Sequence, residues 1–439
     1  MSESPRVGDR SSAKSWLSRI ALDVSPLRAS RDFRLLEIGQ LVSSLGTQVA
    51  LVALPTQIFL ISHSAALVGL LGAFELLPMI VASLLGGAIA DRVDRRKVLL
   101  VAQLGVITTA SILAFVTLSA HPPALVILVL GGLLAGSSSL DAVTRATIIP
   151  RVVAPDRLRS ALAFNYGTYQ LTGIVGPALG GLLIAALGIG AGYLIDAGTC
   201  LAMAAAAVAM SPLPPAAGER PQETIMRSIA DGLRFVRHNQ ALSGSFVIDL
   251  VAMTFGWPRS MFAVLSLTVY HSGTSGTGLL FAALAVGGTL SVVTAGWIEH
   301  ARWLGRITIF MVIGWGCAIA GVGLSRSLVP AMLLLAVAGF ADGVSAICRT
   351  AINQTVTPDE LRGRMSAVYN LVVTGGPRLG DIESGLVAGL TSATTAVLTG
   401  GLACIAGAAG VAVAFPALGR YDGRRPAVQV AAAVPAAET

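Results

Sequence analysis

Long runs of apolar residues dominate the chain, and short segments in which charged residues gather separate them. About 20 apolar residues, at a rise of 1.5 Å each, cover the hydrocarbon core of a bilayer. Because lipid offers no hydrogen-bond partner to the backbone, such runs are expected to be helices rather than open strands. The twelve predicted spans are 35–61, 67–90, 98–119, 124–149, 161–187, 190–210, 241–270, 277–298, 304–325, 328–350, 365–389 and 394–415.

The charges between these spans predict their orientation. If the N-terminus is placed inside, the segments that face the cytoplasm hold 25 of the 30 Lys and Arg residues, whereas the opposite loops hold only Arg326. An excess of Lys and Arg in cytoplasmic loops is the usual sign of topology, so both termini are predicted to be cytoplasmic. The cytoplasmic segments are 1–34, 91–97, 150–160, 211–240, 299–306, 353–364 and 416–439.

Composition agrees with a membrane protein. Hydrophobic residues make up 54% of the chain and charged residues 12%, whereas soluble domains carry about 25% charged residues. The net charge of +7 is explained by topology and by attraction to the anionic inner leaflet, so we expect a lipid bilayer partner and no nucleic acid. Arg outnumbers Lys by 28 to 2, which favours a bacterial host and its cell (inner) membrane.

The chain repeats itself after about 200 residues. The P-D-x-L-R sequence of 155–159 recurs at 358–362, and each copy leads into a predicted span that contains Gly-Pro. Arg145 and Arg349 are matched upstream in the same order. Two six-helix halves follow from this repeat. The predicted division is an N-terminal segment 1–34, a six-helix half 35–210, a linker 211–240, a second half 241–415 and a tail 416–439.

A short charged sequence at 87–97, G-A-I-A-D-R-V-D-R-R-K, joins the second and third predicted spans. Its G-x-x-x-D-R-x-x-R-R pattern resembles the loop signature of the major facilitator superfamily of transporters. Residues 55–57 and 357–364 are similar to the branch that contains the bacterial enterobactin (siderophore) exporter and related drug exporters. The resemblance implies an all-α membrane protein with twelve transmembrane helices in two six-helix halves, and a transporter rather than an enzyme.

The same resemblance implies a cytoplasmic gate. In it, Asp91 would latch onto Arg145 and onto the start of the eleventh span, and would hold the outward-open state. A carboxylate at a helix junction favours basic partners and helix N-termini. Arg92 and Arg95 belong to the same predicted gate, although setting the topology explains these two equally well.

Two Gly-Pro motifs form another group of candidate residues. Gly176-Pro177-x-x-Gly180-Gly181 resembles the fifth-span signature of antiporters in the superfamily, except that Thr172 stands where that signature has glycine. The second copy contains Gly376-Pro377. Small residues let membrane helices approach closely, so a helix-packing role is the simplest reading of both motifs. The antiporter resemblance implies a proton gradient as the energy source, with no cofactor and no metal.

Acidic residues inside the predicted spans are candidates for proton or substrate binding, since charges within a membrane are costly. Glu75 lies near the middle of the second span without a cationic neighbour in sequence. Asp249 lies on the seventh span, which the resemblance places beside the cavity. Asp141 and Arg145 are spaced i, i+4, so a local ion pair is as good an interpretation as a functional one.

Two further clusters complete the candidate set. Pro258 is expected to kink the seventh span, where Trp257 and Arg259 would suit an aromatic or anionic ligand. A packing Trp and an outward-pointing Arg explain this pair equally well. On the eleventh span, Arg378 and Asp381 are spaced i, i+3 and are expected to face the protein interior.

The function predicted from these features is secondary active export of a small molecule, a siderophore or a drug, by proton antiport with alternating access. Macrolide or multidrug efflux and lysolipid transport remain alternatives within the same fold. We find no G-x-x-x-x-G-K-[ST] loop for direct ATP drive, and the five His are too scattered for a membrane enzyme. The four Cys are expected to be buried apolar side chains, and the chain is expected to be monomeric.

Overall fold

The computed structural model describes residues 24–90, 92–118, 122–215, 225–358 and 361–424, and all regular structure in them is helical. Most of the predicted N-terminal segment and the end of the predicted tail therefore lie outside the described residues. The long helices are α3 (Arg31–Ser62), α4 (Ala65–Ala90), α5 (Arg95–Thr117), α6 (Ala124–Val152), α7 (Leu158–Leu187), α8 (Ile189–Ala209), α12 (Gly273–Val293), α13 (Leu304–Leu324), α14 (Leu328–Val356), α15 (Arg362–Leu390) and α16 (Ala393–Ala414). The short ones are α2 (Ser25–Ala29), η1 (Pro155–Arg157), α9 (Ile225–His238), α10 (Gln240–Phe255), α11 (Met261–Thr268), η2 (Ala295–His300) and α17 (Pro416–Gly419).

Ten of the described helices are long and apolar enough to cross a membrane, namely α3–α8, α12–α14 and α16. Their ranges agree with ten of the twelve predicted spans to within a few residues at most ends. The remaining two predicted spans differ for physical reasons. The eleventh is the 29-residue helix α15, whose five charged residues lower its hydropathy. The seventh is split into α10 and α11.

The split in the seventh predicted span lies at Pro258, where we expected only a kink. Helix α10 ends at Phe255 and α11 begins at Met261. Proline lacks the N–H that would continue the helix, and the backbone groups released by the break need other partners inside a membrane. One of them, the backbone N–H of Ser260, donates to Oδ1 of Asp381 at 2.9 Å. The break is therefore held by a carboxylate from α15.

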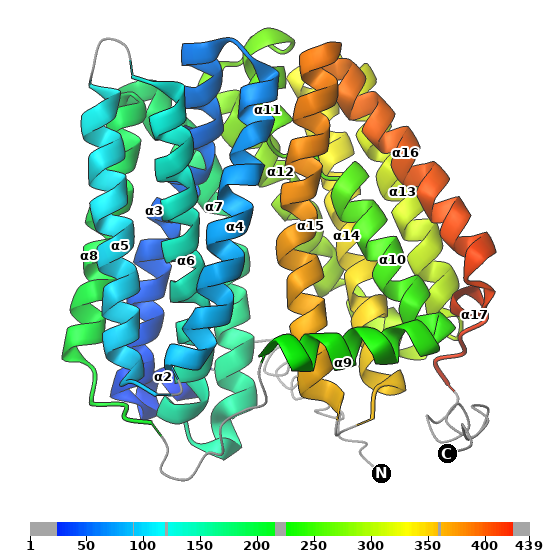
Figure 1. The fold of residues 1–439 in the computed structure, drawn as a ribbon, viewed down its shortest axis with the longest axis horizontal. Helices are drawn as coiled ribbons and strands as arrows, with labels where there is room; N and C mark the ends of the chain where they lie inside the picture. Colours follow the sequence, from blue (N-terminus) through cyan, green and yellow to red (C-terminus); the bar gives the residue numbers. More distant parts are fainter. Residues whose placement is uncertain (1–23, 91, 119–121, 216–224, 359–360, 425–439) are drawn as a thin grey trace, which may run out of the picture.

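The helices pack into two groups that stand side by side (Figure 1). In the first group, α3 packs on α7 and α8, while α5 and α6 extend the bundle and α4 packs on α6. In the second group, α14 packs on α12 and α13, while α10 packs on α15 and α16. Two crossings, α4 with α15 and α7 with α12, make most of the contact between the groups.

Both crossings use glycines at the same end of the bundle. We call the end at which α3 begins and α16 ends the termini end, and the opposite end the far end. A methyl group built on Gly181 of α7 would lie 2.7 Å from the carbonyl oxygen of Thr274 at the far end of α12. One built on Gly72 of α4 would lie 2.8 Å from the carbonyl oxygen of Arg378 on α15. The two groups therefore touch backbone to backbone toward the far end.

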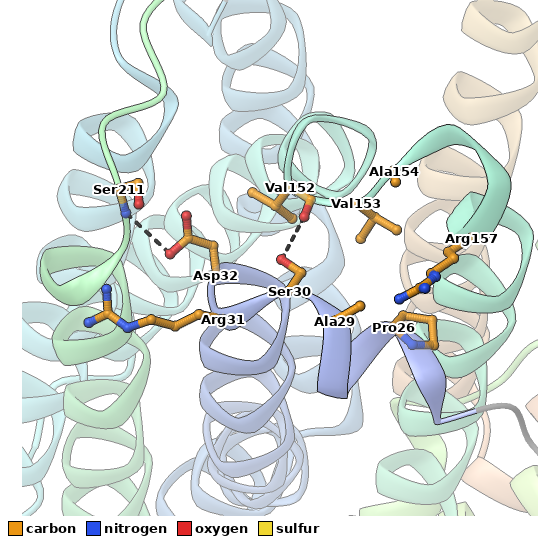
Figure 2. Close-up of a pocket in the computed structure, with 10 residues that line it drawn as sticks. All are labelled: Pro26, Ala29, Ser30, Arg31, Asp32, Val152, Val153, Ala154, Arg157 and Ser211. Atoms are coloured by element: carbon orange, nitrogen blue, oxygen red, sulfur yellow. Dashed lines mark hydrogen bonds between the residues drawn. The ribbon is translucent and has the colours of Figure 1, made fainter.

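The stretch predicted as a linker, 211–240, contains more structure than we expected. Its start is attached to the first group, since Ser211 N donates to Asp32 Oδ1 at 3.3 Å beside a pocket of about 340 Å³ (Figure 2). Its second part forms α9, which lies across the termini end of the second group (Figure 1). Val236 of α9 is buried in an apolar cluster with Phe246 of α10 and Met365 of α15. Buried apolar contacts thus hold a helix that composition alone did not reveal.

Asp94 is expected to hold the termini end of the first group together. It caps α5 by accepting from Arg96 N at 3.1 Å, pairs with Arg96 Nε at 3.1 Å, and accepts from Leu213 N at 3.2 Å. The substitution Asp94→Ala should lower the free energy of unfolding by about 1–2 kcal/mol, the usual cost of losing such a cap. The melting temperature of the purified protein in detergent, read by tryptophan fluorescence, measures this loss.

Asp156→Ala is the matched control for that substitution. The Asp156 side chain is 74% exposed, and its one ion pair with a described residue is with Arg157 at 3.7 Å. Exposed pairs of this kind contribute about 0–1 kcal/mol, so the control should melt close to the unsubstituted protein. Equal melting temperatures for the two variants would contradict the capping role.

Candidate transport cavity

A cavity of about 780 Å³ lies between the two helix groups. Most of its wall comes from α3–α8, and the opposite wall comes from Arg259, Leu371, Thr374 and Arg378. Gln40, in the part of α3 nearest the termini end, also lines it. Because the glycine crossings hold the groups together toward the far end, the cavity extends from the middle of the bundle toward the termini end.

A three-residue ion cluster connects the groups at this cavity. Arg378 Nη1 lies 2.8 Å from Glu75 Oε2 and 3.5 Å from Asp381 Oδ2. The side chains of the two acids are only 8% and 5% exposed. Glu75 had no cationic neighbour in sequence, and the crossing of α4 with α15 supplies one. The pair expected between Arg378 and Asp381 is present, and the same arginine also bridges the two groups.

Arg259 is the cation of the cavity wall without an ion pair among the described residues. Its guanidinium carbon lies 5.5 Å from the ring centre of Trp257 and 5.4 Å from that of Phe281. Trp257 in turn packs edge-on against the fully buried Trp315, with 5.2 Å between the two ring centres. Arg259 lines the cavity, so the alternative of an arginine that points outward is wrong. A cation held by aromatic faces and open to a cavity can attract an anionic or electron-rich ligand.

A second polar site lies in the wall formed by α5 and α6. Asp141 Oδ2 and Arg145 Nη2 are 2.6 Å apart, and Gln103 Nε2 donates to Asp141 Oδ1 at 2.7 Å. All three residues line the cavity. The local ion pair, one of the two interpretations of the i, i+4 spacing, is therefore formed, and it faces the same space as Arg259.

Asp249 lies apart from this cavity. Its Oδ1 is 2.8 Å from Nη1 of Arg349 on α14, and both side chains are 2% exposed. Arg349 Nη2 is also 3.7 Å from Asp342 Oδ1. The structure thus assigns Asp249 to a separate buried cluster within the second helix group, and not to the lining of the cavity.

The predicted cytoplasmic gate cannot be assembled from the described residues, because Asp91 lies outside them. Arg92 is exposed in the turn before α5, whereas Arg95 is 5% exposed at the first position of α5. The backbone N–H of Arg95 donates to Leu213 O at 3.2 Å. Arg145 pairs with Asp141 on its own helix. The latch between Asp91 and Arg145 stays a prediction.

The Gly-Pro motifs lie at helix contacts. Methyl groups built on Gly176 and Gly180 would lie 2.6 Å from Gln48 Cβ and 2.9 Å from Val49 Cα of α3. One built on Gly376 would lie 2.7 Å from Met253 Cβ of α10. Pro177 and Pro377 lie inside α7 and α15. These positions fit the packing role that small residues have in membrane helices.

Two polar residues of these sites were not candidates from sequence. Gln103 and Arg349 stand in apolar runs, and the matching of Arg349 with Arg145 in the repeat was the one signal that could have found that arginine. Among the cysteines, Cys200, Cys348 and Cys404 are buried, whereas Cys317 is exposed on α13, so the expectation of four buried cysteines is wrong for it. It stands on a face of α13 that no other part of the described chain covers.

A bundle of apolar helices around a cavity lined by charged side chains defines a multi-pass membrane transporter. The chain belongs to the family described as transmembrane secretion effector, whose model matches residues 21–429. It is therefore a transporter of the major facilitator superfamily and not an enzyme, as the loop motif at 87–97 implied.

Named relatives are similar over most of the chain. The enterobactin exporter EntS of Citrobacter koseri is 27% identical over 390 residues, which cover 88% of this chain and 92% of the relative. EntS of Salmonella typhi is 26% identical over 391 residues, with the same two coverages. This similarity supports a membrane exporter.

Solved transporters share the fold. A POT family transporter in complex with 5-aminolevulinic acid has a TM-score of 0.70 at 11% identity, covering 89% of this chain and 97% of that one. The nucleoside transporter NupG has a TM-score of 0.67 at 14% identity, covering 89% and 99%. At such low identity these matches establish the fold alone.

Proposed function

We propose that this protein is a secondary active exporter that moves a small molecule, a siderophore or a drug, out of the cell by proton antiport. The observation that carries the proposal is the cavity between the two helix groups, which combines an apolar wall with the charges of Glu75, Arg259 and Arg378. The similarity to enterobactin exporters supports the direction of transport and a siderophore as cargo.

The arrangement in the membrane follows from the same proposal. The ten apolar helices, the split α10–α11 pair and the polar α15 would make twelve transmembrane helices in two halves of six. Because Lys and Arg gather in the segments at the termini end, that end would face the cytoplasm of a bacterial cell. The cavity then opens inward, and the glycine crossings close the outer side. Alternating access would open these crossings and close the termini end, where Asp91 is the proposed latch.

Inverted membrane vesicles test this function directly. We expect enterobactin to accumulate in vesicles that contain the protein when a proton gradient is present, and not after a protonophore dissipates it. The cationic dye ethidium is the parallel probe. Accumulation of several unrelated drugs instead of enterobactin would favour multidrug efflux, and movement of lysolipid alone would favour lipid transport. No gradient-dependent movement of any of them would contradict the proposal.

Arg259 should determine the preference for anionic cargo. A hydrogen bond to a charged group contributes about 1.5–3 kcal/mol, so Arg259→Gln should raise the KM for enterobactin about 10- to 150-fold. The cationic ethidium gains nothing from this guanidinium, so its KM should stay unchanged or fall. Initial rates in inverted vesicles give both values. An equal loss for the two cargoes would show that Arg259 serves the fold instead of the cargo.

A further inference from the structure

A second buried charge cluster lies outside the cavity, and the proposed transport route does not use it. It consists of Asp249 on α10 with Asp342 and Arg349 on α14. The guanidinium of Arg349 lies 2.8 Å from the carboxylate of Asp249 and 3.7 Å from that of Asp342. Asp249 and Arg349 are 2% exposed, whereas the Asp342 side chain is 20% exposed. The three residues are brought together by the packing of α10 against α14.

The cluster holds two acids and one base. Among the described residues, no other cation pairs with either carboxylate. Of the helices around it, α12 carries no ionisable residue, and α13 and α16 carry none beyond Arg306 and two cysteines. Arg306 lies in the first turn of α13, where its Nε donates to Gly419 O. Among the described residues, Tyr166 on α7, Cys348 on α14 and Tyr369 on α15 also interact electrostatically with the cluster, and these side chains are uncharged at neutral pH in their ordinary state.

Hydrogen bonding leaves the two carboxylates incompletely satisfied. Oδ1 of Asp249 and Oδ1 of Asp342 are buried and accept no hydrogen bond from the described residues, although each lies beside the Arg349 guanidinium. With both acids ionised, the cluster would carry one uncompensated negative charge. An uncompensated charge buried away from water is strongly unfavourable. Binding one cation would neutralise this excess negative charge. A proton can do so without the set of ligand atoms that a metal ion requires.

We propose that the Asp249–Arg349–Asp342 cluster binds one exchangeable proton and is the coupling-ion site of the transporter. The proton converts one carboxylate to a carboxylic acid, while Arg349 balances the other. Asp342 is the entry point, because it alone of the three is partly exposed, and Tyr166 of the first helix group lies within its electrostatic range. The inference rests on the proposed antiport function, but proton binding itself can be measured without any cargo.

Infrared spectroscopy of the purified full-length protein tests the proton count. The carbonyl stretch of a protonated carboxyl absorbs at a different frequency from the stretches of a carboxylate. The area of its band is proportional to the number of protonated carboxyl groups. We expect Asp342→Asn and Asp249→Asn each to remove one protonated carboxyl at neutral pH, because one acid then faces one base. Arg349→Gln should add one. The exposed Asp156→Asn is the control and should change nothing.

Three results would overturn this assignment. An unchanged band in both Asn variants would mean that the cluster holds no proton. A band that survives alkaline titration in the unsubstituted protein and disappears in Asp342→Asn would mean a fixed structural proton. Loss of the band on adding sodium at constant pH would mean that the site takes a metal cation.

Transport then links the cluster to coupling. In vesicles, Asp342→Asn should lose gradient-driven accumulation of ethidium while retaining ethidium exchange down its own gradient. Gradient-driven accumulation at the unsubstituted level would contradict the coupling role even if the proton is present. If the unsubstituted protein moves no cargo but shows the expected proton count, the proposed function fails and the proton site stands.

Discussion

Arg378→Gln is expected to abolish gradient-driven transport and to lower the free energy of unfolding by about 3–5 kcal/mol, the usual cost of removing one partner from a buried ion pair. Arg378 is the only cation within 4 Å of both Glu75 and Asp381 among the described residues. Without it, two buried carboxylates face each other across the crossing of α4 with α15. Thermal unfolding in detergent and accumulation in inverted vesicles measure the two effects.

Two further variants test whether the lost charge balance causes the expected effects of Arg378→Gln. The double variant Glu75→Gln/Arg378→Gln should recover part of the lost stability, because Asp381 still accepts the Ser260 N–H and has lost its negative neighbour. Non-additive effects are expected for residues in one network. Arg326→Gln, in the exposed turn before α14, is the matched control and should behave as the unsubstituted protein. A strictly additive double variant would contradict the coupling of these charges.

The second large effect is expected at the far end of the bundle. Gly181→Leu should hold α7 away from α12, because even a methyl group at Gly181 would lie 2.7 Å from Thr274 O and 3.1 Å from Gly278 Cα. Overpacking of this kind costs about 1–3 kcal/mol, which lowers the population of the state closed at the far end by up to about 150-fold. Distances between spin labels on the far ends of α7 and α12 should lengthen, and transport should fall with that population.

Gly314→Leu is the control for this substitution. No atom of the described residues lies within 4 Å of a methyl group built on Gly314, which stands on α13. The control therefore adds the same side chain to a long helix without entering a crossing, and it should leave the label distances unchanged. If Gly181→Leu gives the same distances as Gly314→Leu, the glycine crossing does not set the closure of the far end.

The helices themselves were largely predictable. The span predicted at 124–149 is helix Ala124–Val152, and the span predicted at 328–350 is Leu328–Val356. In both, the helix continues past the predicted span at the termini end, as far as Val152 in the first and Val356 in the second. The hydropathy of a sequence marks the part of a helix that crosses the bilayer core, whereas the backbone hydrogen bonds that define the helix continue through the membrane interface.

Helix α9 shows where this approach fails. Its 14 residues follow a Pro-rich stretch and are too polar for a span, so the segment was interpreted as a linker. Val236 and its neighbours become buried only because α10 and α15 present an apolar surface to them. An amphipathic surface helix gains most of its stability from such packing. The apolar residues of α9 recur at helical spacing, but the local pattern does not say which surface covers them.

The contacts of the candidate site were likewise predictable only in part. Spacing along one helix predicted the contacts of Arg378 with Asp381 and of Asp141 with Arg145, because residues three or four apart share a helix face. The partners of Glu75 and Asp249 come from helices that are distant in sequence. Glu75 was predicted as a proton or substrate site from its place in the span, and the structure adds that it lines the cavity and pairs with Arg378. Asp249 was predicted beside a cavity that it does not line.

The sequence by itself determined that the chain is a helical membrane protein, where its long apolar helices lie, in which segments its Lys and Arg gather and which superfamily it belongs to. These are local properties, set by how many apolar residues follow one another and by where charges interrupt them. Only the tertiary structure decided which charges meet, namely Arg378 with Glu75 and Arg349 with Asp249, and that Arg259 forms no ion pair with a described residue. The physical reason is that burial makes a partner necessary, while the packing of helices distant in sequence decides which partner it is.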